Sequence, residues 1–230
     1  MNKAQLAEEL NKLNLSFDIE KLESLMEDTL LTNEKFNLTA IKDKEKFREL
    51  MLLDSAIPLT LLDFNDKKIL DVGTGAGYPG LVLSLLSKGN FTLLDSTKKK
   101  IDHINEYVSI NNINNVIGVV GRAEEYIINH RNEFDIVIAR AVSSLNILLE
   151  LCVPYLKVGG YFIAMKGRQG QEEIEQSKRA LSLLGCKIVS INETELPESK
   201  ETRINIVIQK EKETNKKYPR LYKDIVNKPL

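Results

Sequence analysis

A glycine-rich run at residues 71–80, DVGTGAGYPG, has the composition of a loop that binds a small molecule. Glycine lets the backbone turn sharply and lets a ligand approach without a Cβ in the way. Read from Gly75, the run satisfies G-x-G-x-x-G with Gly77 and Gly80, which is the pattern of dinucleotide-binding proteins. The pattern alone does not identify a ligand. A glycine-rich turn from strand to helix can also be purely structural and allow the strand and the helix to pack tightly.

Two carboxylates near this run separate the possible ligands. Asp71 stands at a predicted strand end, where dinucleotide-binding folds usually have apolar residues because pyrophosphate is anionic. S-adenosylmethionine instead carries a sulfonium and an α-ammonium group, so an acid beside the loop favours this cofactor. Asp95 ends the next predicted strand, where an acid can accept hydrogen bonds from ribose hydroxyls. The alternative for Asp95 is a helix cap, a role for which Ser96 competes.

Seven short apolar runs predict the strands that position these residues. As far as the sixth run, they alternate with stretches of helical spacing, and this order is typical of a mostly parallel sheet covered on both faces. The runs are KKILDVG, NFTLLDS, NVIGVVG, FDIVIARA, GYFIAMKG, CKIVSINETE and RINIVIQK.

The last two runs are expected to form a hairpin. Only a polar stretch at 192–202, which contains Pro197, separates them, and this is too short for a crossover helix. The final strand should therefore be antiparallel. By analogy, a seven-stranded, mostly parallel sheet with a reversed last strand marks the class I methyltransferase fold, a Rossmann-like α/β fold. Residues 1–65 have apolar side chains at helical spacing and predict an N-terminal helical cap.

The composition excludes several classes of protein. With 43% apolar and 28% charged residues, the chain is neither disordered nor a collagen nor a disulfide scaffold. Lys and Arg number 32 against 33 Asp and Glu, so contact with nucleic acid must depend on local charge. From Lys210 onward, seven Lys or Arg stand against three acids, which predicts a basic C-terminal tail.

We expect a cytoplasmic protein without a bound metal. Cys152 and Cys186 have no CxxC companion and are interpreted as reduced, buried residues. His103 and His130 have no partner at metal-ligand spacing. The N-terminus does not have the pattern of a signal peptide, and no apolar run reaches the length of a membrane span.

Motifs along nearly the whole chain resemble the RsmG (glucose-inhibited-division B) family of bacterial 16S rRNA guanine-N7 methyltransferases. Their order and spacing together carry the resemblance, since no single motif is decisive. The motifs are NLTAI (37–41), LDS (53–55), the glycine run (71–80), LDS (94–96) with KKK (98–100), GRAE (121–124), FD (134–135), RA (140–141), GG (159–160), KG (166–167), KYPR (217–220) and KPL (228–230).

The resemblance implies S-adenosylmethionine as methyl donor and a guanine in the decoding-region loop of small-subunit RNA as acceptor, free or in the small-subunit particle. It places cofactor contacts on Gly73, Tyr78, Ser96, Thr97, Lys98, Ala123, Glu124 and Arg140, beside the Asp71, Gly75, Gly77 and Asp95 derived above. Arg140, Lys166 and Asn37 are candidates to position the RNA, and no residue is assigned as a catalytic acid or base. The chain departs from the family in one place, where Leu50-Met51 replaces an Arg-His pair that often precedes the Asp-Ser dipeptide.

Several of these positions have a structural alternative. Glu124 in the first turn of a helix is stabilising by itself, and Arg140 could form a plain ion pair with Asp135 or Glu124. Lys166, after the fifth predicted strand, could be solvated instead of meeting phosphate. The KKK run at 98–100 opens a helix, where the helix dipole disfavours cations, so that a nearby anion such as RNA would stabilise it. A solvated helix face is the alternative.

We therefore expect three parts: an N-terminal helical cap (1–65), an S-adenosylmethionine-binding methyltransferase domain (66–210) and a basic C-terminal tail (211–230). Two other functions compete with this hypothesis. An NAD-dependent oxidoreductase would use Gly75, Gly77 and Gly80, but Asp71 and the terminal hairpin argue against it. A non-catalytic RNA-binding module would explain the basic tail but would leave the acids and the glycine run without a role.

Overall fold

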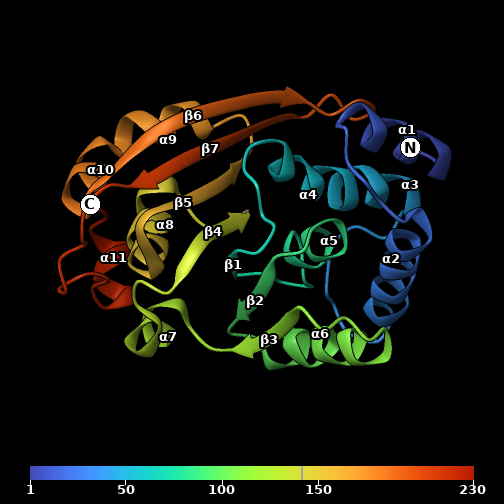
Figure 1. The fold of residues 1–230 in the computed structure, drawn as a ribbon, viewed down its shortest axis with the longest axis horizontal. Coiled ribbons are helices and arrows are strands. Elements are labelled where there is room, and N and C mark those ends of the chain that lie inside the picture. Colours follow the sequence, from blue (N-terminus) through green and yellow to red (C-terminus); the bar gives the residue numbers. More distant parts are fainter. Residues whose placement is uncertain (141) are drawn as a thin grey trace.

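The structure, a computed structural model, describes residues 1–140 and 142–230, which form a seven-stranded sheet with helices on both faces (Figure 1). The strand order is β3-β2-β1-β4-β5-β7-β6. The strands are β1 (Lys68–Val72), β2 (Asn90–Asp95), β3 (Val116–Val120), β4 (Phe134–Arg140), β5 (Leu156–Lys166), β6 (Cys186–Glu195) and β7 (Thr202–Lys210). Each of the seven strands predicted from the apolar runs is present.

The reversed last strand is confirmed. Strands β1 to β5 pair in parallel, whereas β7 is antiparallel to both of its neighbours, β5 and β6. The link between β6 and β7 is short, as expected for a hairpin. Strand β7 lies between β5 and β6, so the last strand of the chain fills the sheet instead of extending its edge.

Each face of the sheet has its own hydrophobic cluster, because successive strand side chains point to opposite faces. In β1, Ile69 belongs to the cluster beneath the N-terminal helices, α5 (Gly80–Leu86) and α6 (Lys98–Ile110). Leu70 belongs to the cluster beneath α7 (Ala123–His130), α8 (Leu145–Cys152) and α10 (Lys178–Leu184). Figure 1 shows these two groups of helices on opposite sides of the sheet. Cys152 and Cys186 are buried free thiols, as predicted.

The helices have the following bounds. On the N-terminal side are α1 (Lys3–Lys12), α2 (Ile19–Asn33), α3 (Lys44–Phe47), the π-helix η1 (Arg48–Leu53), α4 (Asp54–Ala56) and the 3-10 helix η2 (Ile57–Thr60). The crossover and C-terminal helices are α5 (Gly80–Leu86), α6 (Lys98–Ile110), α7 (Ala123–His130), α8 (Leu145–Cys152), the 3-10 helix η3 (Val153–Tyr155), α9 (Gly170–Gln176), α10 (Lys178–Leu184) and α11 (Tyr222–Asn227). Within the described residues, no helix could cross a membrane.

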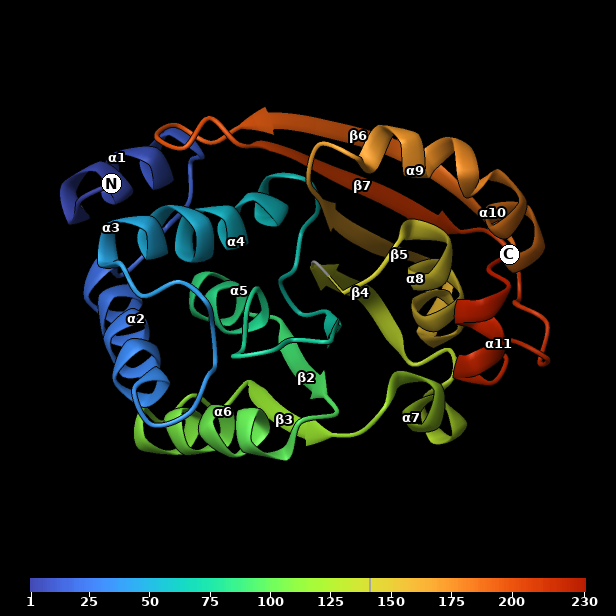
Figure 2. The same ribbon diagram turned by 180° about the vertical axis from the view of Figure 1, so that it is seen from behind.

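The N-terminal helices gather at the side of the sheet opposite to α8, α10 and α11 (Figure 2). Leu6, Leu25 and Phe47 share one buried cluster with strand residues such as Ile69 and Ile138. The helices predicted for residues 1–65 are therefore present and cover one sheet face. The division into three parts stays a prediction about how the chain is organised.

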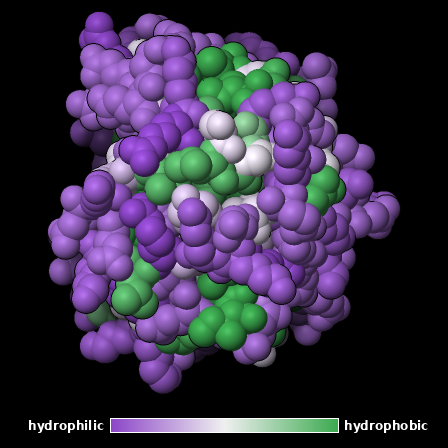
Figure 3. Space-filling model, turned by 90° about the vertical axis from the view of Figure 1, so that its left-hand side faces the viewer, coloured by the Kyte–Doolittle hydropathy of each residue, from purple (hydrophilic) through white to green (hydrophobic). Residues whose placement is uncertain are grey.

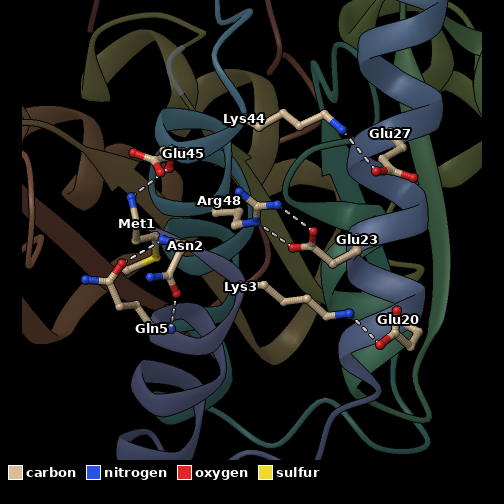
Figure 4. A network of polar contacts seen from close by, with 10 residues as sticks. All are labelled: Met1, Asn2, Lys3, Gln5, Glu20, Glu23, Glu27, Lys44, Glu45 and Arg48. Atoms are coloured by element: carbon tan, nitrogen blue, oxygen red, sulfur yellow. Dashed lines mark hydrogen bonds and ion pairs between the residues drawn. The ribbon is translucent and has the colours of Figure 1, made fainter.

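Three glutamates in a row on α2 form ion pairs with the neighbouring N-terminal helices (Figure 4). Glu23 accepts two hydrogen bonds from the Arg48 guanidinium of η1, both of 2.7 Å. One helical turn to either side, Glu20 pairs with Lys3 of α1 and Glu27 pairs with Lys44 of α3. These pairs hold η1, which carries side chains of the site described below.

The C-terminal segment folds against the sheet. Lys210 is fully buried and donates to the Asn132 side chain and to the carbonyl oxygens of Val153 and Leu156. Lys210 therefore cannot serve as one of the exposed cations of a basic tail.

Figure 3 shows the side of the molecule that carries α7, α10 and α11, where apolar side chains form separate patches in a largely hydrophilic surface.

Candidate active site

The glycine loop is held by backbone contacts with the neighbouring strand. The amides of Gly73 and Thr74 both donate to the carbonyl oxygen of Leu94, at 2.8 and 3.1 Å. Gly73 and Gly75 have φ angles of +73° and +61°, which L side chains rarely adopt. A Cβ on Gly75 would meet no atom within 4 Å, so the loop leaves open space at this residue. The structure thus shows a cradle that glycine keeps free.

Asp95 lies at the carboxyl end of β2 with both carboxyl oxygens engaged. Its Oδ2 accepts from the Gly75 amide at 3.0 Å and its Oδ1 accepts from the Thr97 amide at 2.8 Å. An ionised carboxylate has about four acceptor sites, so lone pairs remain for further donors. Asp95 is therefore a fixed acceptor beside the open side of the loop, and it also holds the loop to the start of α6.

A cavity of about 380 Å³ lies between the glycine loop and the start of α7. Its wall includes seven of the predicted cofactor residues: Gly73, Asp95, Ser96, Thr97, Ala123, Glu124 and Arg140. The acceptor at the end of β2, the open backbone at Gly75 and the strand-end location together fit a nucleoside-containing ligand. S-adenosylmethionine fits this donor and acceptor set, and the binding of ribose hydroxyls by Asp95 stays a prediction.

Other predicted cofactor residues have a different location. Asp71 is fully buried, and its Oδ2 accepts from the Thr74 hydroxyl at 2.7 Å and from the Gly80 amide at 2.9 Å. Asp71 therefore ties the two ends of the loop together. A Cβ on Gly77 would lie 2.4 Å from the side chain of Leu81, so this glycine permits close contact with α5.

Tyr78 points away from the cavity and into the N-terminal helices. Its hydroxyl lies 2.9 Å from the Thr29 hydroxyl, and its ring packs edge-on against Phe47. Lys98 is exposed and pairs with Asp102 at 2.7 Å, so this cation belongs to the outer face of α6. The structure brings neither side chain to the cavity wall, and their assignment as cofactor contacts stays a prediction.

Two of the predicted cofactor residues, Ala123 and Glu124, lie at the start of α7. Glu124 is largely buried and pairs with Arg122 at 2.5 Å, while the Ala123 carbonyl oxygen accepts from the Tyr155 hydroxyl. The Arg122 guanidinium also lies 4.7 Å from the centre of the Tyr222 ring, and Tyr222 lines the same cavity. Tyr222 was not predicted as a site residue, because it is far along the chain from every cofactor motif.

A second and larger cavity, of about 730 Å³, adjoins the first. The two cavities share Arg140 and Val142 in their walls. The larger one is also lined by Leu50 and Met51, the pair that replaces Arg-His, and by Lys166 at the end of β5. The site therefore consists of two chambers that meet at the end of β4. Ala141, part of the RA motif, lies outside the described residues.

Arg140 is held by the π-helix η1 and the short helix α4. Its guanidinium donates to the carbonyl oxygen of Leu50 and to the Ser55 hydroxyl, both at 3.2 Å, and lies 3.5 Å from Asp54. Arg140 is thus paired with Asp54, and not with the acids considered from sequence. Burial lowers the pKa of Arg140, whereas the charge of Asp54 opposes this shift.

Asp54 joins two cations at the wall of the larger cavity. Besides Arg140, Arg203 of β7 lies 3.1 Å from its Oδ2. Burial raises the pKa of Asp54, and the two arginines oppose that effect. The chain separations, about 85 residues to Arg140 and about 150 to Arg203, leave no local sequence signal for this cluster.

Lys166 and Asn37 differ from expectation in their surroundings. Lys166 is buried, donates to the Ser143 carbonyl oxygen and pairs with Glu173 at 2.8 Å, so it is not a solvated lysine. Asn37 is exposed in the loop after α2 and lines neither cavity. The structure therefore joins Lys166 with Arg140 in one chamber but leaves Asn37 outside it.

Known proteins provide an independent comparison. The family model GidB, rRNA small subunit methyltransferase G, matches residues 18–203. The chain belongs to this family. Ribosomal RNA small subunit methyltransferase G of Fusobacterium nucleatum is 40% identical over 227 residues, which cover 97% of each chain. The protein of the same name from Alkaliphilus metalliredigens is 41% identical over 95% of both chains.

Solved structures show the same fold at low identity. TYW2 of M. jannaschii in complex with AdoMet has a TM-score of 0.57 and 15% identity, covering 69% of this chain and 76% of that one. An rRNA methylase from Streptococcus thermophilus has a TM-score of 0.50 and 16% identity, covering 70% and 95%. The family resemblance and the class I methyltransferase fold are thus confirmed. This member of the GidB family is an S-adenosylmethionine-dependent rRNA methyltransferase.

Two further predictions concern metals and histidines. Among the described residues, no group of three or more His, Cys, Asp or Glu side chains could hold a metal ion. His103 is buried on α6, 3.6 Å from Asp28 of α2, and His130 lies 2.7 Å from Glu133. Neither histidine lines the two chambers. Both are engaged with acids elsewhere in the fold.

Proposed function

We propose that this GidB family member methylates N7 of a guanine in the decoding-region loop of bacterial 16S rRNA, as free RNA or in the small-subunit particle. The observation that supports this most directly is the pair of adjoining cavities. The smaller one is lined by Gly73 of the glycine loop and by the Asp95 acceptor, whereas the larger one opens beside it at Arg140. A base in the larger cavity would therefore lie next to a donor in the smaller one.

The residues in the chambers suit an acceptor that carries no proton. Guanine N7 has an in-plane lone pair, so attack on a methyl group needs no general base. Of the described lining residues, none is a His or a Cys. Arg140 stays protonated at neutral pH and cannot accept a proton. We assign Arg140 to positioning, either of the cofactor carboxylate or of the RNA.

When bound, S-adenosylmethionine supplies an electrophilic methyl group on a positively charged sulfur. The protein then has mainly to hold donor and acceptor at attack distance and in line, which supplies roughly 7–11 kcal/mol of the barrier in favourable cases. Asp95 and the backbone at Gly75 would hold the nucleoside part.

A substrate analogue tests the acceptor atom. RNA with 7-deazaguanine at the target keeps the Watson–Crick edge but lacks the N7 lone pair, and we expect it to accept no methyl group. Single-turnover transfer to ordinary RNA should show no titration of an enzyme base near neutral pH. Methylation of the deaza substrate at the same residue would contradict N7 as the acceptor.

Calorimetric titration separates the enzyme from the two other hypotheses. The methyltransferase should bind S-adenosylmethionine and not NAD. An oxidoreductase should show the opposite preference, whereas an RNA-binding module should bind neither. Binding of NAD in preference to S-adenosylmethionine would overturn the proposed function.

A further inference from the structure

One carboxylate in the larger cavity is held in place by two different elements and has not been assigned a role. Glu173 lies on α9, and its Oε2 accepts from Lys166 Nζ at 2.8 Å and from the Leu145 amide at 2.5 Å. Lys166 ends β5, and Leu145 begins α8. The side chain is 20% exposed and lines the cavity. Glu173 is therefore a preorganised group at the wall of the larger cavity.

The other carboxyl oxygen of Glu173 is available to a ligand. Among the described residues, each side-chain hydrogen bond and ion pair of Glu173 involves Oε2. An ionised carboxylate acts only as an acceptor, so Oε1 can receive donors from a molecule in the cavity.

The two other acids of this cavity are less suited to contact a base. Asp54 is only 5% exposed, and Arg140 and Arg203 both approach its Oδ2. Glu201 is 51% exposed and pairs with Arg203 at 2.9 Å, so water competes for it. Glu173 combines a fixed position with an accessible oxygen.

We propose that Glu173 recognises the Watson–Crick edge of the target guanine. This edge presents two adjacent donors, N1–H and the N2 amino group, and the two lone pairs of Glu173 Oε1 can accept from both. Adenine presents an acceptor at N1 and would meet Glu173 with repulsion. N7 lies on the opposite side of the purine, so contact at the Watson–Crick edge leaves N7 free to face the smaller cavity. The proposal rests on the proposed function, since it names the residue that selects its substrate base.

Inosine tests this contact because it keeps N1–H and N7 but lacks the N2 amino group. The methylated guanine is first mapped in 16S rRNA, and a ligated RNA is prepared with inosine at that position alone. We expect the parent enzyme to prefer guanine over inosine by roughly tenfold or more in kcat/KM, which is typical for a lost hydrogen bond to a charged group. In Glu173→Ala this preference should fall toward one.

The ratio of the two substrates separates recognition from structural damage. Loss of the Lys166 partner slows both RNAs alike, so it cancels in the ratio. Glu173→Gln provides a second variant of nearly equal size and should also lose the preference, because the amide presents donors where guanine needs acceptors. Glu201→Ala, which removes another acid of the same cavity, should keep the parent preference. Both Glu173 variants are assayed as protein that binds S-adenosylmethionine with parent affinity.

The possible results are distinguishable. An equal preference for guanine in the parent and in both Glu173 variants would overturn the role of Glu173 and leave the proposed function intact. If Glu201→Ala loses the preference for guanine while both Glu173 variants keep it, then Glu201 recognises the base, and the proposal is overturned. If the mapping finds no guanine that the parent methylates at N7 in 16S rRNA, either free or in the small-subunit particle, the proposed function fails, and the role of Glu173 falls with it.

Discussion

Arg220 forms hydrogen bonds to the buried carboxylate of Glu150 with both its side chain and its backbone amide. Arg220 Nε donates to Glu150 Oε1 at 2.8 Å, Nη2 donates to Oε2 at 2.6 Å, and the Arg220 amide donates to Oε1 at 2.9 Å. Glu150 belongs to α8 and is fully buried. Since Tyr222 follows two residues later and lines the cofactor cavity, this contact positions part of the site.

Replacing Arg220 tests this anchor. Arg220→Ala leaves a buried carboxylate without its ionic partner, a change that typically costs about 3–5 kcal/mol. We expect the free energy of unfolding, measured in urea, to fall by an amount in that range. Lys217→Ala, at an exposed cation of the same segment, should change it by less than about 0.5 kcal/mol. Equal stability of both variants would contradict the anchor.

Asp95 should contribute directly to cofactor affinity. Asp95→Ala removes an acceptor for ribose hydroxyls and leaves the amides of Gly75 and Thr97 without their partner. We expect binding of S-adenosylmethionine to weaken by about 1–3 kcal/mol in calorimetry. Asp102→Ala, at an exposed acid on α6, serves as control. Parent-like affinity in folded Asp95→Ala would show that the site is elsewhere.

Two glycines form a matched pair for testing the cradle. Gly75 and Gly159 have φ angles of +61° and +87°, and a Cβ on either would meet no atom within 4 Å. Valine at either position should therefore impose a similar backbone strain. Only Gly75→Val should also abolish binding of S-adenosylmethionine, because its methyl groups would occupy the ligand space. If the two variants bind the cofactor equally well, the open space at Gly75 is not the ligand path.

The exposed cations of the C-terminal segment are candidates for phosphate contacts. Removing the whole segment would remove the buried Lys210 and the Arg220 anchor, so single substitutions are the better test. For Lys216→Ala and Lys223→Ala, we expect the salt dependence of RNA binding to shrink by about 0.7 per lost contact to a single strand. Lys88→Ala, at an exposed cation in the link between α5 and β2, should leave it unchanged. Unchanged slopes in all three variants would exclude these contacts.

The free energy of unfolding should depend on pH because of the buried carboxyl group of Asp71. Burial raises the pKa of Asp71 to about 6, despite hydrogen bonds from Thr74 and Gly80. The folded protein then holds a proton that the unfolded chain releases, so the unfolding free energy should decrease as the pH rises from about 4 to 6. This contribution amounts to about 3 kcal/mol at most. Asp71→Asn should lack that slope, and parallel curves for parent and variant would contradict the shift.

The fold was predictable from sequence because the apolar runs that form the strands and the short link before the last strand are both local features. Apolar runs such as NFTLLDS and FDIVIARA match buried strands, and the short link before β7 excludes a crossover helix. Asp95 was predictable for the same reason, since a strand end followed by a helix fixes its location at the carboxyl edge of the sheet.

Side-chain direction and distant partners were not predictable. Asp71 and Asp95 both lie near strand ends, yet Asp71 points beneath the loop and Asp95 lines the cavity. In strands that are covered on both faces, hydrophobic patterning does not distinguish these directions. The contacts of Arg140 with Leu50 and Asp54 bring together residues about 90 positions apart, and no spacing rule anticipates them.

The position of β7 between β5 and β6 constrains the order in which this sheet can be completed during synthesis. Until residues 202–210 have left the ribosome, β5 presents an unpaired edge and β6 has no neighbour in the sheet. Tyr222, which closes the cofactor cavity, follows later still. Ligand binding stabilises only the state that binds it, so the nascent enzyme gains the full stabilisation by its cofactor only after Tyr222 has joined the cavity wall.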